Sequence, residues 1–201
     1  MDFSRFEKQL EFLREMDKVK SVFRNTLLLD ASRCENDTEH SWHMAVCAMM
    51  FAEYMDEPIN DMSRLLQMIM LHDVIEIYAG DTFAYGGAAE ISSQSERERA
   101  AADKLFLLLP EDQANNFRSL WDEFEAYATP EAKCARCVDT FMPVYHNYMT
   151  QGKKWREFGV TKDKILKRCQ NIKKGSDKLY GFICGLIDDA VQKGYIAGEN
   201  K

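Results

Sequence analysis

The chain has 201 residues, a length that one hydrophobic core can serve, so we expect a single domain over 1–201. Hydrophobic residues make up 46% and charged residues 29% of the chain, which excludes disorder of the whole chain. Lys and Arg number 26 against 33 Asp and Glu, a net charge of −7. A nucleic-acid polymer and an anionic membrane are therefore not expected as partners.

The residue composition also favours one fold class and one compartment. Ten glycines and four prolines are too few for the many turns of a β-sandwich or barrel, so we expect an all-α protein. The N-terminal stretch is charged throughout, no run of 18 apolar residues occurs, and the six cysteines are irregularly spaced. These features predict a cytoplasmic protein with free thiols.

Helical spacing of apolar residues and helix-end signals divide the chain into elements. We expect a bundle of six or more helices, with a metal-site core of about 36–146 and C-terminal helices of about 161–194. The predicted elements, in chain order, are a helix over 3–22, an irregular connection over 24–36, and helices over 37–55, 60–80, 93–109, 112–127, 130–149, 162–173 and 177–193, with a flexible loop over 81–91.

Polar residues interrupt the apolar faces of three of these helices. His40 lies on the apolar face of the helix predicted over 37–55, and the adjacent pair His72-Asp73 lies on the helix predicted over 60–80. Asp139 lies on the apolar face of the helix predicted over 130–149. An ionised carboxylate on an apolar face is costly unless a cation or hydrogen-bond donors stabilise it. A set of imidazoles and carboxylates suits Mn, Fe, Co, Ni or Zn and leaves room for water and substrate, as in hydrolytic sites.

These residues, within ENDTEHSWH, LHDVIEIYAGD and CVDTF, resemble the signature of the HD-domain metal-dependent phosphohydrolases. The spacing is most similar to the 5′-deoxynucleotidase-like branch of that family. The resemblance implies an HD-type helical fold that binds one divalent metal ion, of the kinds Mn, Co, Fe, Ni, Zn or Mg. The ligands that the resemblance implies are His40, His72, Asp73 and Asp139.

The resemblance also implies roles for residues around the metal. Glu76 follows His72 by one helical turn and is expected to act as a general acid or base. Asp81 is expected to position water or the sugar. Arg24 and Arg33 are alternative candidates for holding the substrate phosphate, because a guanidinium matches phosphate oxygens. Glu39 either orients His40 or faces solvent.

The segment after Gly80 departs from the pattern of this branch, because GDTFAYGGAAE lacks the usual proline and lysine. The implied function is nonetheless a phosphomonoesterase that releases phosphate from 5′-deoxynucleoside monophosphates, with a small phosphorylated substrate as its partner. The alternatives are a phosphodiesterase, a hydrolase of another small phosphate ester, or a catalytically silent regulator that binds metal or nucleotide. Apolar residues near the chain ends, Phe3, Phe6, Phe182 and Ile183, favour a homodimer.

Overall fold

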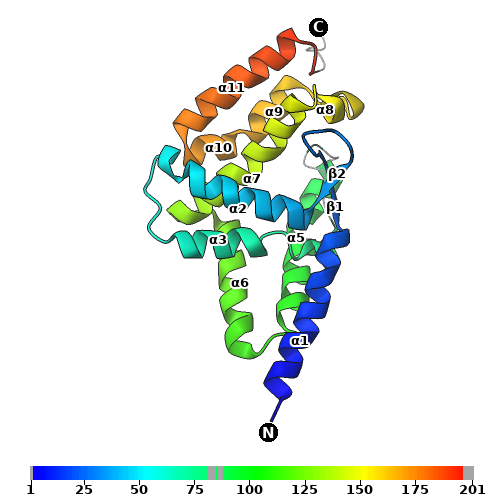
Figure 1. Cartoon of the computed structure of the whole chain (residues 1–201), viewed down its shortest axis with the longest axis vertical. Helices are drawn as coiled ribbons and strands as arrows, with labels where there is room; N and C mark the ends of the chain where they lie inside the picture. The colour runs from blue at the N-terminus through cyan, green and yellow to red at the C-terminus, as the bar shows by residue number, and fades with distance from the viewer. Residues whose placement is uncertain (1, 81–84, 86–87, 197–201) are drawn as a thin grey trace.

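The computed structural model of the chain describes residues 2–80, 85 and 88–196. Within them the chain is mainly helical, as the sequence predicts (Figure 1). The elements are α1 (Ser4–Met16), the 3-10 helix η1 (Asp17–Ser21), β1 (Phe23–Leu27), β2 (Cys34–Asn36), α2 (Asp37–Phe51), the 3-10 helix η2 (Ala52–Tyr54), α3 (Met62–Leu71), α4 (Glu76–Ala79), α5 (Ala88–Phe106), α6 (Glu111–Ala126), α7 (Pro130–Met149), α8 (Lys153–Glu157), α9 (Lys162–Arg168), α10 (Gln170–Gly175) and α11 (Asp177–Gln192).

Side-chain caps fix where the site helices begin. Asn36 caps α2: its side chain accepts a hydrogen bond from the Glu39 N–H at 2.9 Å, and the Glu39 carboxylate accepts one from the Asn36 N–H at 3.0 Å. This reciprocal pair satisfies two otherwise unpaired donors of the first turn. Thr129 caps α7 through the Ala132 N–H, with Pro130 at the first helical position as the sequence predicts.

A short antiparallel hairpin replaces the irregular connection predicted over 24–36. Strands β1 and β2 pair with one another, and the Leu28 N–H donates to the Arg33 carbonyl at 2.9 Å beyond them. Ala31 adopts a positive φ of 57° in the connecting turn. β1 carries three polar residues in a row and β2 has only three residues, so neither shows an alternation of apolar and polar positions. The pairing brings Arg24 and Glu35 side by side just before α2.

The helix predicted over 60–80 is interrupted, which corrects that prediction. α3 ends at Leu71, and the chain restarts as α4 only at Glu76. The His72 ring explains the break, because its Nδ1 lies 2.7 Å from the Ile69 carbonyl, which a continuing α-helix would pair with the N–H of residue 73. A tight turn follows, in which the Glu76 N–H donates to the Asp73 carbonyl at 2.9 Å.

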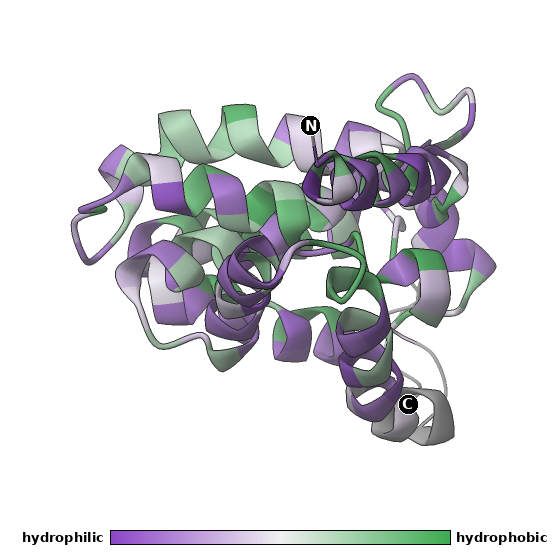
Figure 2. Ribbon diagram, turned by 90° about the horizontal axis from the view of Figure 1, so that it is seen from below, coloured by the Kyte–Doolittle hydropathy of each residue, from purple (hydrophilic) through white to green (hydrophobic). Residues whose placement is uncertain are grey.

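Two groups of buried apolar residues surround this turn. The larger group packs α2, α3, α7, α10 and α11 together, and the smaller one packs α1, α5 and α6 around Ile75 and Trp121. Figure 1 shows α1, α5 and α6 at the end that holds the N-terminus, and α11 at the opposite end. Most helices carry both hydrophilic and hydrophobic residues (Figure 2). His72 and Asp73 lie where the two groups meet.

The C-terminal helices differ from the prediction at one point. The helix predicted over 162–173 is divided into α9 and α10 at the fully buried Cys169.

Of the apolar residues assigned to a dimer face, Phe3, Phe6 and Phe182 are exposed, whereas Ile183 is buried in the larger core group. No helix in the described part of the chain is long and apolar enough to cross a lipid bilayer.

Candidate metal centre and the adjoining cavity

Three side chains from three separate helices meet at one point of the interior. His40 comes from α2, His72 from the residue that follows α3, and Asp139 from the middle of α7. One nitrogen or oxygen atom of each lies within 4.8 Å of the others, and all three residues are buried. Nε2 of His40 lies 3.2 Å and Nε2 of His72 4.0 Å from Oδ1 of Asp139. This group could hold a metal ion, and it contains three of the four ligands that the resemblance implies.

The fourth implied ligand, Asp73, lies beside this group. Its Oδ2 is 2.8 Å from Nε2 of His72, and the same oxygen forms an ion pair with the Arg24 guanidinium. Asp73 thus contacts one member of the group directly, and the same oxygen also pairs with Arg24. The predicted set of four is brought to one place, with Asp73 shared between the imidazole and the guanidinium.

The hydrogen bonds of His72 test whether this group fits a metal ion. Because a backbone carbonyl only accepts, Nδ1 of His72 carries the proton in its 2.7 Å contact with Ile69. Its Nε2 is buried and lies 2.8 Å from Oδ2 of Asp73 and 4.0 Å from Oδ1 of Asp139. An imidazole nitrogen beside two carboxylate oxygens is a suitable set of metal donors once that nitrogen is deprotonated, so the donor set fits a divalent metal.

His40 is oriented by a carboxylate that the sequence analysis did not select. Nδ1 of His40 lies 3.3 Å from Oε1 of Glu35, the middle residue of β2, and Glu35 is 2% exposed. A carboxylate behind a histidine fixes the ring and leaves the other nitrogen for a metal. Glu39, the residue weighed for this role, caps α2 and pairs with Arg33 instead. A signal was present, since Glu35 opens the ENDTEH motif.

The ionised side chains of the metal group are stabilised by one another, because burial removes them from solvent. Burial and the Arg24 charge lower the pKa of His40, but the carboxylates of Asp139 and Glu35 outweigh them and raise that pKa to about 8. Burial also opposes ionisation of Asp139, yet the two histidines hold its pKa well below the usual range. For Asp73, His72 and Arg24 outweigh burial in the same direction. The ligand set therefore retains ionised carboxylates.

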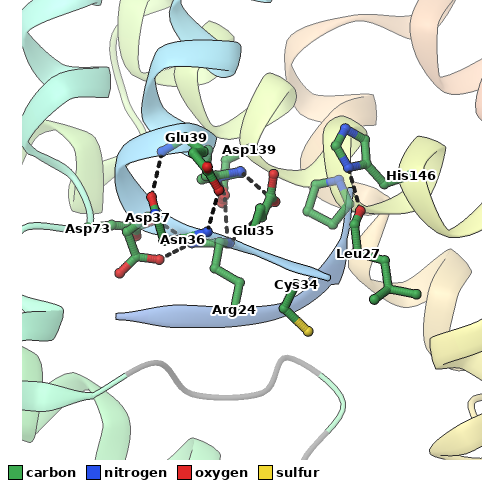
Figure 3. A network of polar contacts seen from close by, with 12 residues as sticks. Arg24, Leu27, Cys34, Glu35, Asn36, Asp37, Glu39, Asp73, Asp139 and His146 are labelled. Atoms are coloured by element: carbon green, nitrogen blue, oxygen red, sulfur yellow. Dashed lines mark hydrogen bonds and ion pairs between the residues drawn. The ribbon is translucent and has the colours of Figure 1, made fainter. Parts of the chain in front are cut away.

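The two candidate arginines lie in different places. Arg24 reaches four carboxylates: it pairs with Asp73 and lies 3.4 Å from Asp37, 3.8 Å from Asp139 and 3.9 Å from Glu35. Figure 3 shows this network between β1, β2 and α2. Arg33 is outside it, because its side chain is 49% exposed and pairs with Glu39 at 2.5 Å. The structure thus brings Arg24, and not Arg33, to the metal group.

A cavity of about 350 Å³ adjoins the metal group. Glu76 lines it and is 8% exposed, so the interrupted helix still brings this carboxylate beside His72 and Asp73. Asp81, the other predicted catalytic residue, lies outside the described residues. The lining side chains that sequence reasoning did not select come from α5, α6, α7 and α9, and include Gln94, Glu98, Trp121, Glu125, Arg136 and Arg168.

The chain matches a family model described as HD domain over residues 16–180. Human 5′-deoxynucleotidase HDDC2 is 30% identical over 131 residues, which is 65% of this chain and 62% of the human protein. The fission yeast 5′-deoxynucleotidase hdd1, from Schizosaccharomyces pombe, is 24% identical over 134 residues, 65% of this chain and 66% of its own. This chain therefore spans less than two thirds of the length of either curated relative.

Solved structures agree with this match. A crystal structure named as a predicted metal-dependent phosphohydrolase from Magnetospirillum magnetotacticum MS-1 is 45% identical, with a TM-score of 0.90 over 96% of both chains. The PH0347 protein of Pyrococcus horikoshii OT3 shares the fold alone, with 16% identity and a TM-score of 0.60 over 92% of this chain and 99% of its own. The chain belongs to the HD domain family, and the family predicted from its motifs is confirmed.

Proposed function

We propose that this protein is a metal-dependent phosphomonoesterase that releases phosphate from 5′-deoxynucleoside monophosphates. The observation that carries the proposal is the buried group of His40, His72 and Asp139, whose donor atoms lie within 4.8 Å of one another at the edge of a cavity lined by a further carboxylate, Glu76. The names of the curated relatives, 5′-deoxynucleotidases from human and fission yeast, support the substrate class.

His40, His72, Asp73 and Asp139 would hold the divalent ion, and Glu35 would fix the ring of His40 behind it. When bound, such an ion supplies Lewis acidity toward a phosphoryl oxygen and makes water a better nucleophile near neutral pH. Arg24 offsets the negative charge of the carboxylates that surround it and keeps Asp73 oriented toward His72. The metal-binding role of these side chains is the first part of the proposal.

Glu76 is proposed to move the proton of the reaction. It lines the cavity beside His72 and Asp73 and is screened from bulk water, so its carboxyl group lies within reach of a phosphate ester bound there. A carboxyl group in this place takes a proton from the attacking water or returns one to the leaving 5′-oxygen. The role of Asp81 in positioning water or the sugar stays a prediction.

The decisive experiment measures phosphate release from a panel of ribo- and deoxyribonucleoside monophosphates. Metal-stripped protein is reloaded separately with Mn, Co, Mg and Zn, and Asp139→Asn serves as the matched variant with a crippled metal site. We expect turnover confined to deoxynucleotides, dependent on the added ion, and lost together with bound metal in Asp139→Asn.

Other outcomes would separate the alternatives. Turnover of a phosphodiester or of a non-nucleotide ester, with silence on the panel, would replace the substrate class and keep the metal chemistry. Metal bound without any turnover of mono- or diesters would refute the enzyme and favour a regulator. Activity that survives in Asp139→Asn with an unchanged metal content would refute the ligand set.

A further inference from the structure

Three arginines line the cavity beside the metal group, and they differ in what their guanidinium groups contact. Arg24 is surrounded by four carboxylates. Arg136 pairs with Glu125 at 2.5 Å and lies over the Phe124 ring, 4.1 Å from its centroid. Arg168 makes no hydrogen bond and no ion pair with any residue that the structure describes. Arg168 is therefore the guanidinium in this cavity whose donors are available to a ligand.

The backbone at Arg168 is held in place, although its guanidinium forms no hydrogen bond or ion pair with the described residues. Arg168 is the last residue of α9, next to the fully buried Cys169. Just beyond it, the Tyr127 hydroxyl donates to the Asn171 carbonyl, and the Asn171 side chain donates to Oγ1 of Thr140 at 3.5 Å. These contacts tie the first turn of α10 to the end of α6 and to α7, where Thr140 follows the candidate ligand Asp139.

The cavity is acidic and would repel a phosphate dianion without a dedicated cation. Its lining carries five carboxylates, Asp73, Glu76, Glu98, Glu125 and Asp139. Burial raises the pKa of Glu98 and of Glu125, as expected where negative charges are poorly solvated. The charge of Arg168 is felt at Asp139, where it helps to keep the pKa of that carboxyl low. A positive group that pairs with no carboxylate of the described residues, near the candidate metal ligands, suits such a dianion.

We propose that Arg168 binds the phosphate group of the substrate, with two N–H donors directed at two phosphoryl oxygens. A guanidinium matches phosphate in this two-point geometry, and its hydrogen bonds to an anion are stronger than those between neutral groups. The inference rests on the proposed function only in taking a phosphate ester as the ligand. It adds a substrate-binding residue that is distant in sequence from every motif of the site.

The test measures inorganic phosphate binding to the Mn-loaded protein by titration calorimetry, so that it does not depend on turnover. Arg168→Met removes the charge and the donors, and Arg168→Lys keeps the charge without the fork. Lys167→Met, at the exposed neighbouring position on α9, is the matched charge control. Metal content and thermal melting are measured for every variant.

We expect Arg168→Met to raise the Kd for phosphate by about 10- to 100-fold, since a hydrogen bond to a charged group contributes about 1.5–3 kcal/mol. Arg168→Lys should fall between wild type and Arg168→Met, and Lys167→Met should match wild type. The protein should still bind its metal and melt at nearly the same temperature, because Arg168 forms no hydrogen bond or ion pair with the described residues.

The inference is overturned if Arg168→Met binds phosphate within about twofold of wild type, or if wild type binds none at millimolar concentration. If Arg168→Met does not fold, an Arg168→Lys variant with wild-type affinity overturns it equally. A wild-type protein that binds phosphate through Arg168 but hydrolyses no nucleotide would refute the proposed function and leave this inference standing. Hydrolysis of nucleotides with the same KM in Arg168→Met as in wild type would support the proposed function and overturn this inference.

Discussion

In the metal-free protein, the charge on His40 makes stability depend on pH, and Glu35→Gln isolates that dependence. Asp139 and Glu35 raise the pKa of His40 to about 8 in the folded state, against about 6.5 when the chain is unfolded. A raised pKa gives stability that is fully present below about pH 6.5 and lost as pH rises through about 8. The difference of about 1.5 pKa units corresponds to about 2 kcal/mol at this fully buried site.

The measurement is urea unfolding, followed by helical circular dichroism with chelator present, at several values between about pH 6.5 and about pH 8.5. Wild type should lose about 1.5 kcal/mol of unfolding free energy over this range, and Glu35→Gln should lose clearly less, because one of the two carboxylates that hold the charged imidazole is gone. Glu39→Gln is the matched control: Glu39 caps α2 and pairs with Arg33, and glutamine also serves in a capping box.

The direction of the pH dependence distinguishes His40 from its neighbour His43, because their pKa values shift in opposite directions. Burial and the His146 charge lower the pKa of His43, so its contribution is lost only as pH falls below about 6.5. A wild-type unfolding free energy that is flat or rises between about pH 6.5 and about pH 8 would refute the reasoning. So would a pH dependence in Glu35→Gln equal to that of wild type and of Glu39→Gln.

Two further predictions address the catalytic and charged groups. Glu76→Gln should retain its metal and lose about 10²- to 10⁴-fold in kcat, as expected when a general acid or base is removed; full kcat with bound metal would remove that role. Arg24→Met leaves four carboxylates, three of them buried, without this cation and should destabilise the metal-free protein by about 3–5 kcal/mol. The exposed Arg33→Ala should cost less than about 1 kcal/mol. Thermal melts compare the two, and a larger loss from Arg33→Ala would reverse the assignment.

Much of the architecture was contained in local sequence signals. The caps at Thr129 and Ser176 start α7 and α11 where predicted, and Gly80 ends α4 with a positive φ of 76°. These are short-range effects, because a cap or a left-handed glycine acts within one helical turn. The HD-type fold followed from such signals together with the spacing of histidines and aspartates.

Two of the elements predicted from the sequence differ from the structure, each for a specific reason. The helix over 60–80 looked continuous because its apolar spacing is regular, whereas the Nδ1 proton of His72 takes the Ile69 carbonyl and interrupts it. The hairpin over 23–36 gives no sequence signal, because FRNTL in β1 does not alternate apolar and polar residues and β2 has only three residues. In both places a hydrogen bond that depends on side-chain orientation or chain reversal overrode the local pattern.

The sequence alone determined the family, the helical class and the identity of the residues that meet at the candidate metal group, because those features are carried by motifs and by the period of the helix. Only the tertiary structure decided which groups support them. Glu35 stands behind His40, Arg24 is enclosed by carboxylates, and Arg168 reaches the cavity from α9. Such contacts join residues far apart in the chain, and their energies depend on burial and distance, which the packing of helices sets and no local pattern encodes.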